Sequence, residues 1–357
     1  MNHPSRVRLA ALPLAALSLG LVACAGPQAT GPAPTGRPST ATSPEAASST
    51  PNPTPQTITP PTWQGALTLA PVTHVKPSPP TGFVPPKCPR PRTTVGTISL
   101  SPAANLPKGH HPAEKSIEPG TNHSPEADAY VYPAATVQGW ITGTVPQPTD
   151  KKIAFLTFDD GPTGVTTPQV LKVLTEQHAH ATFFTIARQV DDTTGQLLRA
   201  EIAQGSAVAI HSYGHGYSYL YPHRTGSVTN IACDIDWAQA TLQAVLGDGY
   251  RTQVTRYPGG HMSWKGLTAA DAAEAKRGHV WLDWNAMDGD ADASVPHTTA
   301  ADMVANIPRT LNQNKPDRRN VAVILMHDMY PNQKTVDALP KIIENLRAQG
   351  YVFGVIS

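Results

Sequence analysis

The 357 residues suffice for one large domain with extensions, and the charge is nearly balanced, with 27 Lys and Arg against 26 Asp and Glu. This balance gives no bulk electrostatic attraction to nucleic acid, so a nucleic-acid-binding function is not expected. Cys88 and Cys233 are too few and too far apart to form a structural zinc site by themselves.

The first residues have the pattern of a bacterial lipoprotein signal peptide, residues 1–23. Arg6 and Arg8 precede an apolar run that is shorter than the roughly 20 residues that a membrane-spanning helix requires. The run ends in "LVAC", which resembles a lipobox and predicts cleavage before Cys24 and lipidation of its thiol. We therefore expect the mature protein on the outer face of the bacterial cell membrane. An ordinary secretory signal is the alternative.

Residues 24–91 have the composition of a disordered tether. They are rich in Pro, Thr, Ser and Ala, show no apolar periodicity and cannot bury a core. Residues 92–150 have no clear structural pattern and are treated as an N-terminal extension. Cys88 and Cys233 would both lie outside the cytoplasm, where disulfides form, but their separation does not show whether they meet.

Residues 151–357 alternate short apolar runs with helical stretches. Strands are predicted at residues 153–158, 181–186, 206–212, 254–260, 280–285, 321–328 and 352–357. Helices are predicted near residues 166–178, 194–204, 226–246, 266–277, 299–312 and 335–349. Continuous apolar strands with helical crossovers predict a parallel sheet covered on both sides, either a barrel or a doubly wound sheet.

Ionisable residues gather where these strands are predicted to end, which is the functional edge of parallel α/β folds. Asp159 and Asp160 follow the first strand, and His211 and His215 lie at or after the end of the third. At helical spacing the two imidazoles would share one face, and with a carboxylate they make a His₂Asp metal site that keeps a position open for water. The alternatives without a metal are that the histidines are hydrogen-bonded residues of the core and that "DDGP" forms a turn.

Five motifs now come in order: "TFDDGP", "HSYGH", "RYPGG", "DWN" and "LMHD". Together they resemble the motifs of the polysaccharide deacetylase family with the NodB homology domain (carbohydrate esterase family 4), and are similar to those of peptidoglycan N-acetylglucosamine deacetylases. The resemblance covers about Lys151–Ser357. It implies a distorted (β/α) barrel with fewer than eight strands, consistent with the seven parallel strands predicted here.

The resemblance also implies a divalent metal ion and its ligands. Asp160, His211 and His215 match the metal-binding residues, and Asp159 matches the general base. Zinc is the expected ion, with Co²⁺, Mn²⁺ or Ni²⁺ as alternatives. The paired carboxylates would then divide their work, since one binds the ion while the other accepts a proton from water.

The remaining site residues are implied by the later motifs. Arg256 matches the arginine that pairs with the base, and His327 matches the catalytic acid. Asp283 or a nearby carboxylate would hold His327, although three further aspartates crowd the same segment, at positions 288, 290 and 292. Leu325 would line the acetyl pocket, and Trp284 would form one of its walls. The substrate-binding residues implied by "RYPGG" are Tyr257, Pro258 and Gly259.

The expected activity is hydrolysis of N-acetyl groups from amino sugars of a polysaccharide, with cell-wall peptidoglycan as the expected substrate. An O-acetyl esterase acting on xylan or wall sugars and an inactive glycan-binding lipoprotein are the alternatives. The chain departs from the common family pattern at Ala209-Ile210 and at Gly259-Gly260, which affects the expected pocket width. Tyr217, Tyr219 and Tyr221 alternate in "GYSYLY", either as a sugar-stacking wall or as packing at the barrel rim. A monomer is expected.

Overall fold

The computed structural model describes Cys88 and residues 117–191, 193–292, 299–312 and 318–357. The predicted signal peptide, the predicted tether apart from Cys88 and the extension up to residue 116 lie outside the described residues. Within these described ranges, no helix has both the length and the apolar character needed to cross a membrane.

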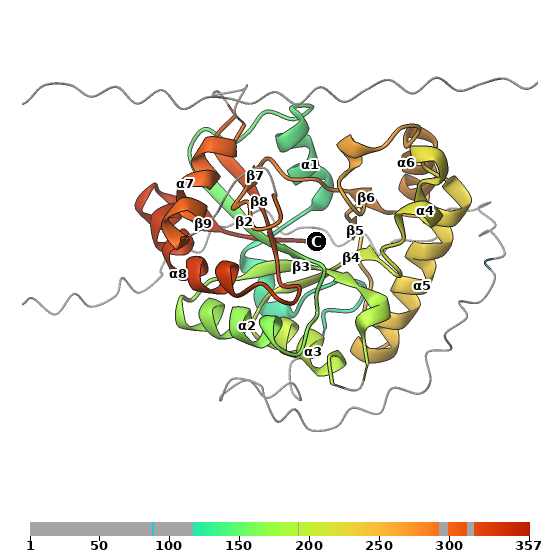
Figure 1. Cartoon of the computed structure of the whole chain (residues 1–357), viewed down its shortest axis with the longest axis horizontal. Helices are drawn as coiled ribbons and strands as arrows, with labels where there is room; N and C mark the ends of the chain where they lie inside the picture. The colour runs from blue at the N-terminus through green and yellow to red at the C-terminus, as the bar shows by residue number, and fades with distance from the viewer. Residues whose placement is uncertain (1–87, 89–116, 192, 293–298, 313–317) are drawn as a thin grey trace, which may run out of the picture. The chain divides into compact units, whose positions relative to one another are not determined.

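A parallel sheet forms the centre of the described domain (Figure 1). Its strands follow one another in the order β6-β5-β4-β3-β2-β8-β7, and β9 also pairs with β2. The short strands are β5 (Val254–Thr255), β6 (Val280–Trp281) and β7 (Ala286–Met287). The longer strands are β2 (Lys152–Asp159), β3 (Ala181–Ile186), β4 (Ala207–Ser212), β8 (Val321–His327) and β9 (Tyr351–Phe353). Within the described residues the outer strands β6 and β7 do not pair with each other, so the sheet curls without closing. The predicted distorted barrel of about seven parallel strands is confirmed.

Strand β2 shows why the predicted strands are apolar on both faces. Ile153 and Phe155 pack into the cluster that includes Val137 and Trp140, whereas Leu156 and its alternate neighbours pack into a second cluster under the outer helices. Successive side chains of a strand point to opposite faces, so burial of both faces requires a continuous apolar run.

Helices surround the strands, and Figure 1 shows α7 and α8 on one side, α5 and α6 on the opposite side, and α2 and α3 between them. The bounds of the helices that follow β2 are α2 (Thr166–Glu176), α3 (Gly195–Ala203), α4 (Tyr217–Leu220), α5 (Val228–Leu246), α6 (Thr268–Ala275), α7 (Ala300–Thr310) and α8 (Gln333–Ala348). Helix α5 begins after Ser227, whose hydroxyl accepts from the N–H of Asn230. Helix α7 begins with a capping box between Thr299 and Asp302.

Two predicted strands are much shorter than expected. Strand β5 covers only Val254–Thr255 and β6 only Val280–Trp281. The predicted strand cannot extend to residue 260, because Gly259 and Gly260 adopt positive φ angles of 78° and 81°, which an extended strand does not allow. Strand β7 (Ala286–Met287) was not predicted, since two residues carry no periodic signal.

The end of the predicted extension is part of the domain. Strand β1 (Val131–Tyr132) pairs in parallel with β10 (Val355–Ile356), and α1 (Ala134–Thr142) follows it. Helix α1 buries Val137 and Trp140 against the barrel. A two-residue strand and a helix containing Gly139 gave no pattern from which these elements could be predicted.

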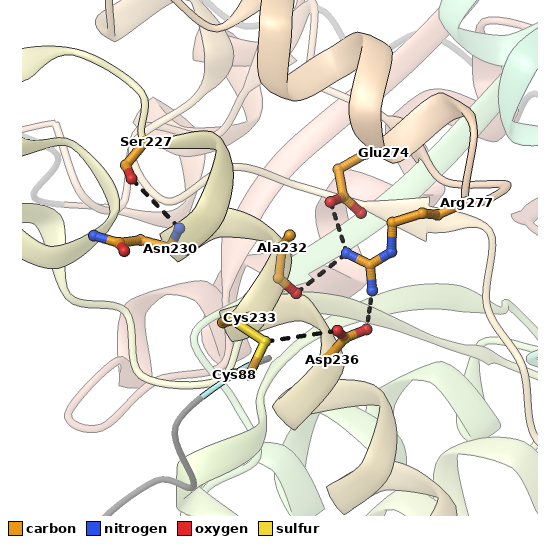
Figure 2. Close-up of a disulfide and its surroundings, with 8 residues drawn as sticks. All are labelled: Cys88, Ser227, Asn230, Ala232, Cys233, Asp236, Glu274 and Arg277. Atoms are coloured by element: carbon orange, nitrogen blue, oxygen red, sulfur yellow. Dashed lines mark hydrogen bonds and ion pairs between the residues drawn. A yellow bond between two sulfur atoms is a disulfide. The ribbon is translucent and has the colours of Figure 1, made fainter. Parts of the chain in front are cut away.

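A disulfide joins Cys88 to Cys233 on α5, with Cα atoms 5.3 Å apart (Figure 2). This confirms a pairing that the sequence left open. Beside it, Arg277 makes an ion pair with Asp236 and a second one with Glu274, whose Oε1 lies 2.8 Å from Arg277 Nη1. The disulfide therefore fixes residue 88 to the helix layer on the side of α5 and α6.

Candidate active site

The register of the sheet places the first and last of the five motifs side by side. Strands β2 and β8 pair in parallel, and Asp159 lies opposite His327. Asp160 follows with a φ of 71°, a left-handed conformation that is uncommon for a residue with a side chain. The carbonyl of Asp160 accepts a hydrogen bond from Gln189 Nε2 at 2.8 Å, which supports this turn. The two carboxylates thus leave the strand end in different directions.

Arg256 holds the carboxylate of Asp159. Its Nη1 donates to Asp159 Oδ1 at 2.7 Å and to Thr157 Oγ1 at 2.9 Å, and its Nε donates to the carbonyl of Leu282 at 2.9 Å. The Arg256 side chain is fully buried, and its guanidinium lies 3.8 Å from the ring centroid of Phe184. Because a buried charge requires compensation, the ion pair and these hydrogen bonds fix one orientation of the carboxylate.

Asp160, His211 and His215 form a candidate metal site. Their nearest ligand atoms all lie within 4.8 Å of one another. Asp160 Oδ1 lies 3.4 Å from His211 Nε2 and 3.3 Å from His215 Nε2, yet this buried oxygen has no hydrogen-bond partner of good geometry. A buried carboxylate oxygen facing two imidazole nitrogens without a hydrogen bond suits a cation with nitrogen and oxygen ligands. The three predicted ligands are therefore brought together and fit a divalent ion.

The orientation of the His211 ring is set by a contact with its other nitrogen, Nδ1. Its Nδ1 lies 2.9 Å from the carbonyl oxygen of Arg256, so the ring turns Nε2 toward Asp160. Such a partner on the second ring nitrogen fixes both the tautomer and the direction of a metal-binding histidine. For His215, burial and the charge of His211 lower the pKa, which favours the neutral imidazole that a metal requires.

The spacing of the two histidines suggested that they share a helix face, but they do not. His211 lies in β4, and His215 follows in a turn with a φ of 50°. Ser212 Oγ accepts from the N–H groups of His215 at 2.7 Å and Gly214 at 3.0 Å. The expectation of helical spacing is wrong, because a turn closed by the Ser212 hydroxyl brings the imidazoles together.

Asp234 on α5 stabilises this turn through hydrogen bonds. Its Oδ2 accepts from Ser212 Oγ and from the N–H of Tyr213, both at 2.7 Å, and its Oδ1 accepts from the N–H of Gly214 at 3.1 Å. Asp234 is buried, so the three donors also compensate the cost of placing a carboxylate there. The sequence gave no sign of this role, because Asp234 lies inside a long helix.

The carboxylate that holds His327 is Asp290, one of the nearby carboxylates that the sequence left open, so the first choice of Asp283 is wrong. His327 Nδ1 lies 2.8 Å from Asp290 Oδ1, and the His327 N–H donates to Asp290 Oδ2 at 2.8 Å. Asn332 and Thr335 donate to the same Oδ2. Burial lowers the pKa of His327, but the hydrogen bond and charge of Asp290 outweigh it and raise the pKa to about 9.

Asp283 instead holds the loop that follows β5. Its Oδ1 accepts from the N–H of His261 at 2.9 Å, and its carbonyl accepts from Arg256 Nη2 at 3.3 Å. Burial raises the pKa of Asp283, an effect that the His261 N–H opposes. The short strand β6 ends at Trp281, which puts Asp283 on the side of the Gly259-Gly260 loop, whereas Asp290 follows β7 on the side of β8.

The predicted substrate-binding residues are placed unequally. Tyr257 is buried and its hydroxyl donates to Asp271 Oδ1 on α6 at 2.9 Å, so its polar end is directed into the helix layer. Pro258 and Gly259 continue along the loop, and the N–H of Gly259 makes no hydrogen bond within the described residues. Trp284 packs against Gly260, where an added Cβ would lie 2.8 Å from the indole. Leu325 lies in β8 opposite Thr157.

The chain was compared with known families and proteins. The family model described as polysaccharide deacetylase matches residues 146–277. A peptidoglycan-N-acetylglucosamine deacetylase of Bacillus cereus is 33% identical over 212 residues, which cover 57% of this chain and 69% of that protein. A bifunctional xylanase/deacetylase of Pseudobutyrivibrio xylanivorans is 28% identical over 245 residues, which cover 68% of this chain and 36% of that protein.

A solved structure gives the same family. The esterase of carbohydrate esterase family 4 from Streptococcus mutans aligns with a TM-score of 0.63 and 40% sequence identity, covering 68% of this chain and 98% of that one. The motif order, the Asp-His-His cluster and these similarities lead to one conclusion. The chain belongs to the polysaccharide deacetylase family, carbohydrate esterase family 4.

Proposed function

We propose that this polysaccharide deacetylase removes N-acetyl groups from amino sugars of cell-wall peptidoglycan. The observation that carries the chemistry is the Asp160–His211–His215 cluster, which lies beside the Arg256-bound Asp159, together with the Asp290-bound His327 on the neighbouring strand. The similarity to a peptidoglycan-N-acetylglucosamine deacetylase over 57% of the chain supports the choice of substrate.

The reaction requires attack of water on an unreactive amide carbonyl. A divalent ion at Asp160, His211 and His215, with zinc as our choice, would supply Lewis-acid chemistry that polarises the carbonyl and acidifies water. Asp159 accepts the proton that water loses, and Arg256 keeps the carboxylate oriented for that transfer. The free N–H of Gly259 can donate to the oxygen that gains negative charge.

His327 completes the reaction at the leaving group. Its Nδ1 is held by Asp290, so the Nε2 proton is the one available to the departing nitrogen. The C–N bond breaks as this proton is transferred, and the products are acetate and a free amino sugar. The high pKa of about 9 keeps His327 protonated at neutral pH, as a general acid requires.

The test is acetate release by the purified, metal-loaded protein. Peptidoglycan glycan strands, N-acetylated chitooligosaccharides and O-acetylated xylan are supplied separately at equal acetyl content. We expect release from the first to exceed release from the other two. Release from acetylated xylan alone would favour the O-acetyl esterase, and release from none of them would contradict the proposed activity.

We also propose that the protein is attached to the outer face of the cell membrane through a lipid on Cys24. The support is the lipobox-like sequence at the end of the apolar run, followed by the Pro- and Thr-rich residues 24–91. Such a tether would let the domain reach wall glycan while it remains bound to the membrane.

A further inference from the structure

An exposed tyrosine stands beside the candidate metal site. Tyr217 opens α4 two residues after His215, and the two ring centroids lie 5.1 Å apart. About 46% of Tyr217 is exposed, although it contacts His215 on one side and Trp264 at 5.2 Å on another. An exposed aromatic ring next to a reaction centre is a candidate for ligand contact, because exposed apolar surface at such a place often marks a binding site.

The support behind Tyr217 is rigid. Trp264 Nε1 donates to the carbonyl of Pro258 at 2.8 Å. The indole stacks on the buried Tyr221 with centroids 4.1 Å apart and an interplanar angle of 16°. The guanidinium of Arg224 lies 5.0 Å from the same indole. Trp264 therefore cannot turn freely, and Tyr217 rests on a fixed aromatic base.

The three tyrosines of "GYSYLY" have separate positions. Tyr221 is buried in the barrel rim, and Tyr219 stacks on Trp237 of α5 with an interplanar angle of 20°. Of the three, Tyr217 is the one whose ring contacts His215, and it is also the most exposed. Rim packing thus explains Tyr221, but it leaves the exposed face of Tyr217 unexplained.

The hydroxyl of Tyr217 faces the loop that carries Gly259. A Cβ added at Gly259 would lie 3.4 Å from the Tyr217 oxygen and 3.4 Å from the Trp264 indole. The Tyr217 hydroxyl makes no hydrogen bond with another described residue. An apolar ring and an unused hydroxyl at one place match a pyranose, which has apolar C–H faces and equatorial hydroxyls.

We propose that Tyr217, supported by Trp264, binds the sugar unit next to the one that loses its acetyl group. This inference rests on the proposed function. His327 and His215 lie on opposite sides of Asp159 in the strand order β4-β3-β2-β8, so the departing nitrogen belongs on the β8 side. Tyr217 lies on the opposite side, next to His215. On this proposal the glycan runs across the cluster from the β8 side, and the next sugar unit reaches the Tyr217 ring.

The experiment compares Tyr217→Ala and Tyr217→Phe with Tyr219→Ala, a matched control on the same short helix. Each metal-loaded variant is assayed for kcat/KM on an N-acetylated chitotetraose and on 4-nitrophenyl acetate, which carries no sugar. We expect Tyr217→Ala to lose about tenfold on the tetraose, mainly through KM, with metal content and ester hydrolysis unchanged. Tyr217→Phe should lose less than Tyr217→Ala, and Tyr219→Ala should resemble wild type.

Equal losses on both substrates, or no loss on either, would overturn the subsite. Binding of the tetraose to metal-loaded Asp159→Asn, measured by calorimetry with and without Tyr217→Ala, separates the subsite from turnover. Weaker binding with Tyr217→Ala supports the subsite even if the wild type releases no acetate, which would contradict only the proposed function. Unchanged binding refutes the subsite even if acetate release is confirmed.

Discussion

Asp290 holds His327 at two points, through the imidazole Nδ1 at 2.8 Å and through the main-chain N–H at 2.8 Å. Asp288 lies behind this pair, and its Oδ1 accepts from the N–H of Asp290 at 3.0 Å. Burial and the charge of Asp290 raise the pKa of Asp288 well above its usual range. The segment that follows β7 therefore places one ionised carboxylate at His327 and a second, more easily protonated one behind it.

Asp290→Asn should move the alkaline limit of activity to lower pH. The carboxylate raises the pKa of His327, so its removal lowers that pKa, and the acid form of His327 is lost earlier as pH rises. We expect a shift of about one pH unit or more. Because His327 also loses the carboxylate that orients its ring, we expect a roughly 10²-fold lower kcat at neutral pH as well. The pH profile of kcat checks this, with Asp283→Asn as the matched control. If the alkaline limb of the pH profile shifts in Asp283→Asn and stays unchanged in Asp290→Asn, then Asp283 is the partner of His327.

Asp159 and Asp160 should respond differently to substitution. Asp160→Ala removes a metal ligand, so metal content and acetate release should fall together. Asp159→Asn leaves the three ligands in place but cannot accept a proton, so we expect retained metal and a loss of roughly two to four orders of magnitude in kcat. Metal analysis and acetate release are measured on both variants. Loss of metal from Asp159→Asn but not from Asp160→Ala would reverse the two assignments.

Asp234→Ala should weaken metal binding without removing a ligand. The variant leaves Ser212 Oγ and the N–H of Tyr213 without their acceptor and removes one of the two acceptors of the Gly214 N–H, so His215 is held less firmly. We expect the metal dissociation constant to rise about 10- to 100-fold. Competition with a chelator measures it, and Asp236→Ala serves as control because Asp236 binds Arg277 instead. Equal metal affinities in the two variants would show that the hydrogen bonds of Asp234 do not support the metal site.

Much of the site could be predicted because strand ends are visible in the sequence. Asp159, His211 and His327 each end an apolar run, and parallel pairing brings such ends to one edge. The partner of His327 could not be predicted in the same way. Asp283 and Asp290 are seven residues apart on a segment whose only strand is the two-residue β7, and no periodicity indicates which of them faces β8.

Other features depend on tertiary contacts alone. The predicted helical face for His211 and His215 failed because Ser212 closes a local turn, and that turn is held by Asp234, which lies 22 residues further along the chain. Helix α1 was missed because its burial depends on β1 meeting β10. The disulfide likewise required the fold, since sequence separation carries no information on whether two cysteines meet.

Removal of the disulfide should lower stability more than activity. In a Cys24→Ser background, Cys88→Ser with Cys233→Ser loses a cross-link that closes a long loop. We expect a decrease of about 2–4 kcal/mol in the free energy of unfolding and a melting temperature lower by about 10 °C. Thermal unfolding and thiol titration of the parent protein check this. Two reactive thiols in the natively secreted parent would contradict the pairing.

Cys24→Ser should release the protein from the membrane. The thiol is the predicted site of lipidation, and the lipid is the proposed attachment to the membrane. Fractionation of cells expressing wild type and variant, with mass spectrometry of the N-terminal peptide, measures the effect. Wild type recovered wholly in the culture fluid without acyl groups would contradict the lipoprotein proposal.

The pairing of β1 with β10 affects the order in which the domain folds. Val131 and Tyr132 find their partners at Val355 and Ile356, and the whole sheet lies between them in sequence. Closing so long a loop is entropically costly, and folding slows as contacts become more distant in sequence. During synthesis β1 emerges long before its partner, so its apolar residues must wait unpaired. In refolding followed by hydrogen exchange, we expect the amides of β10 to gain protection after those of β2 and β3.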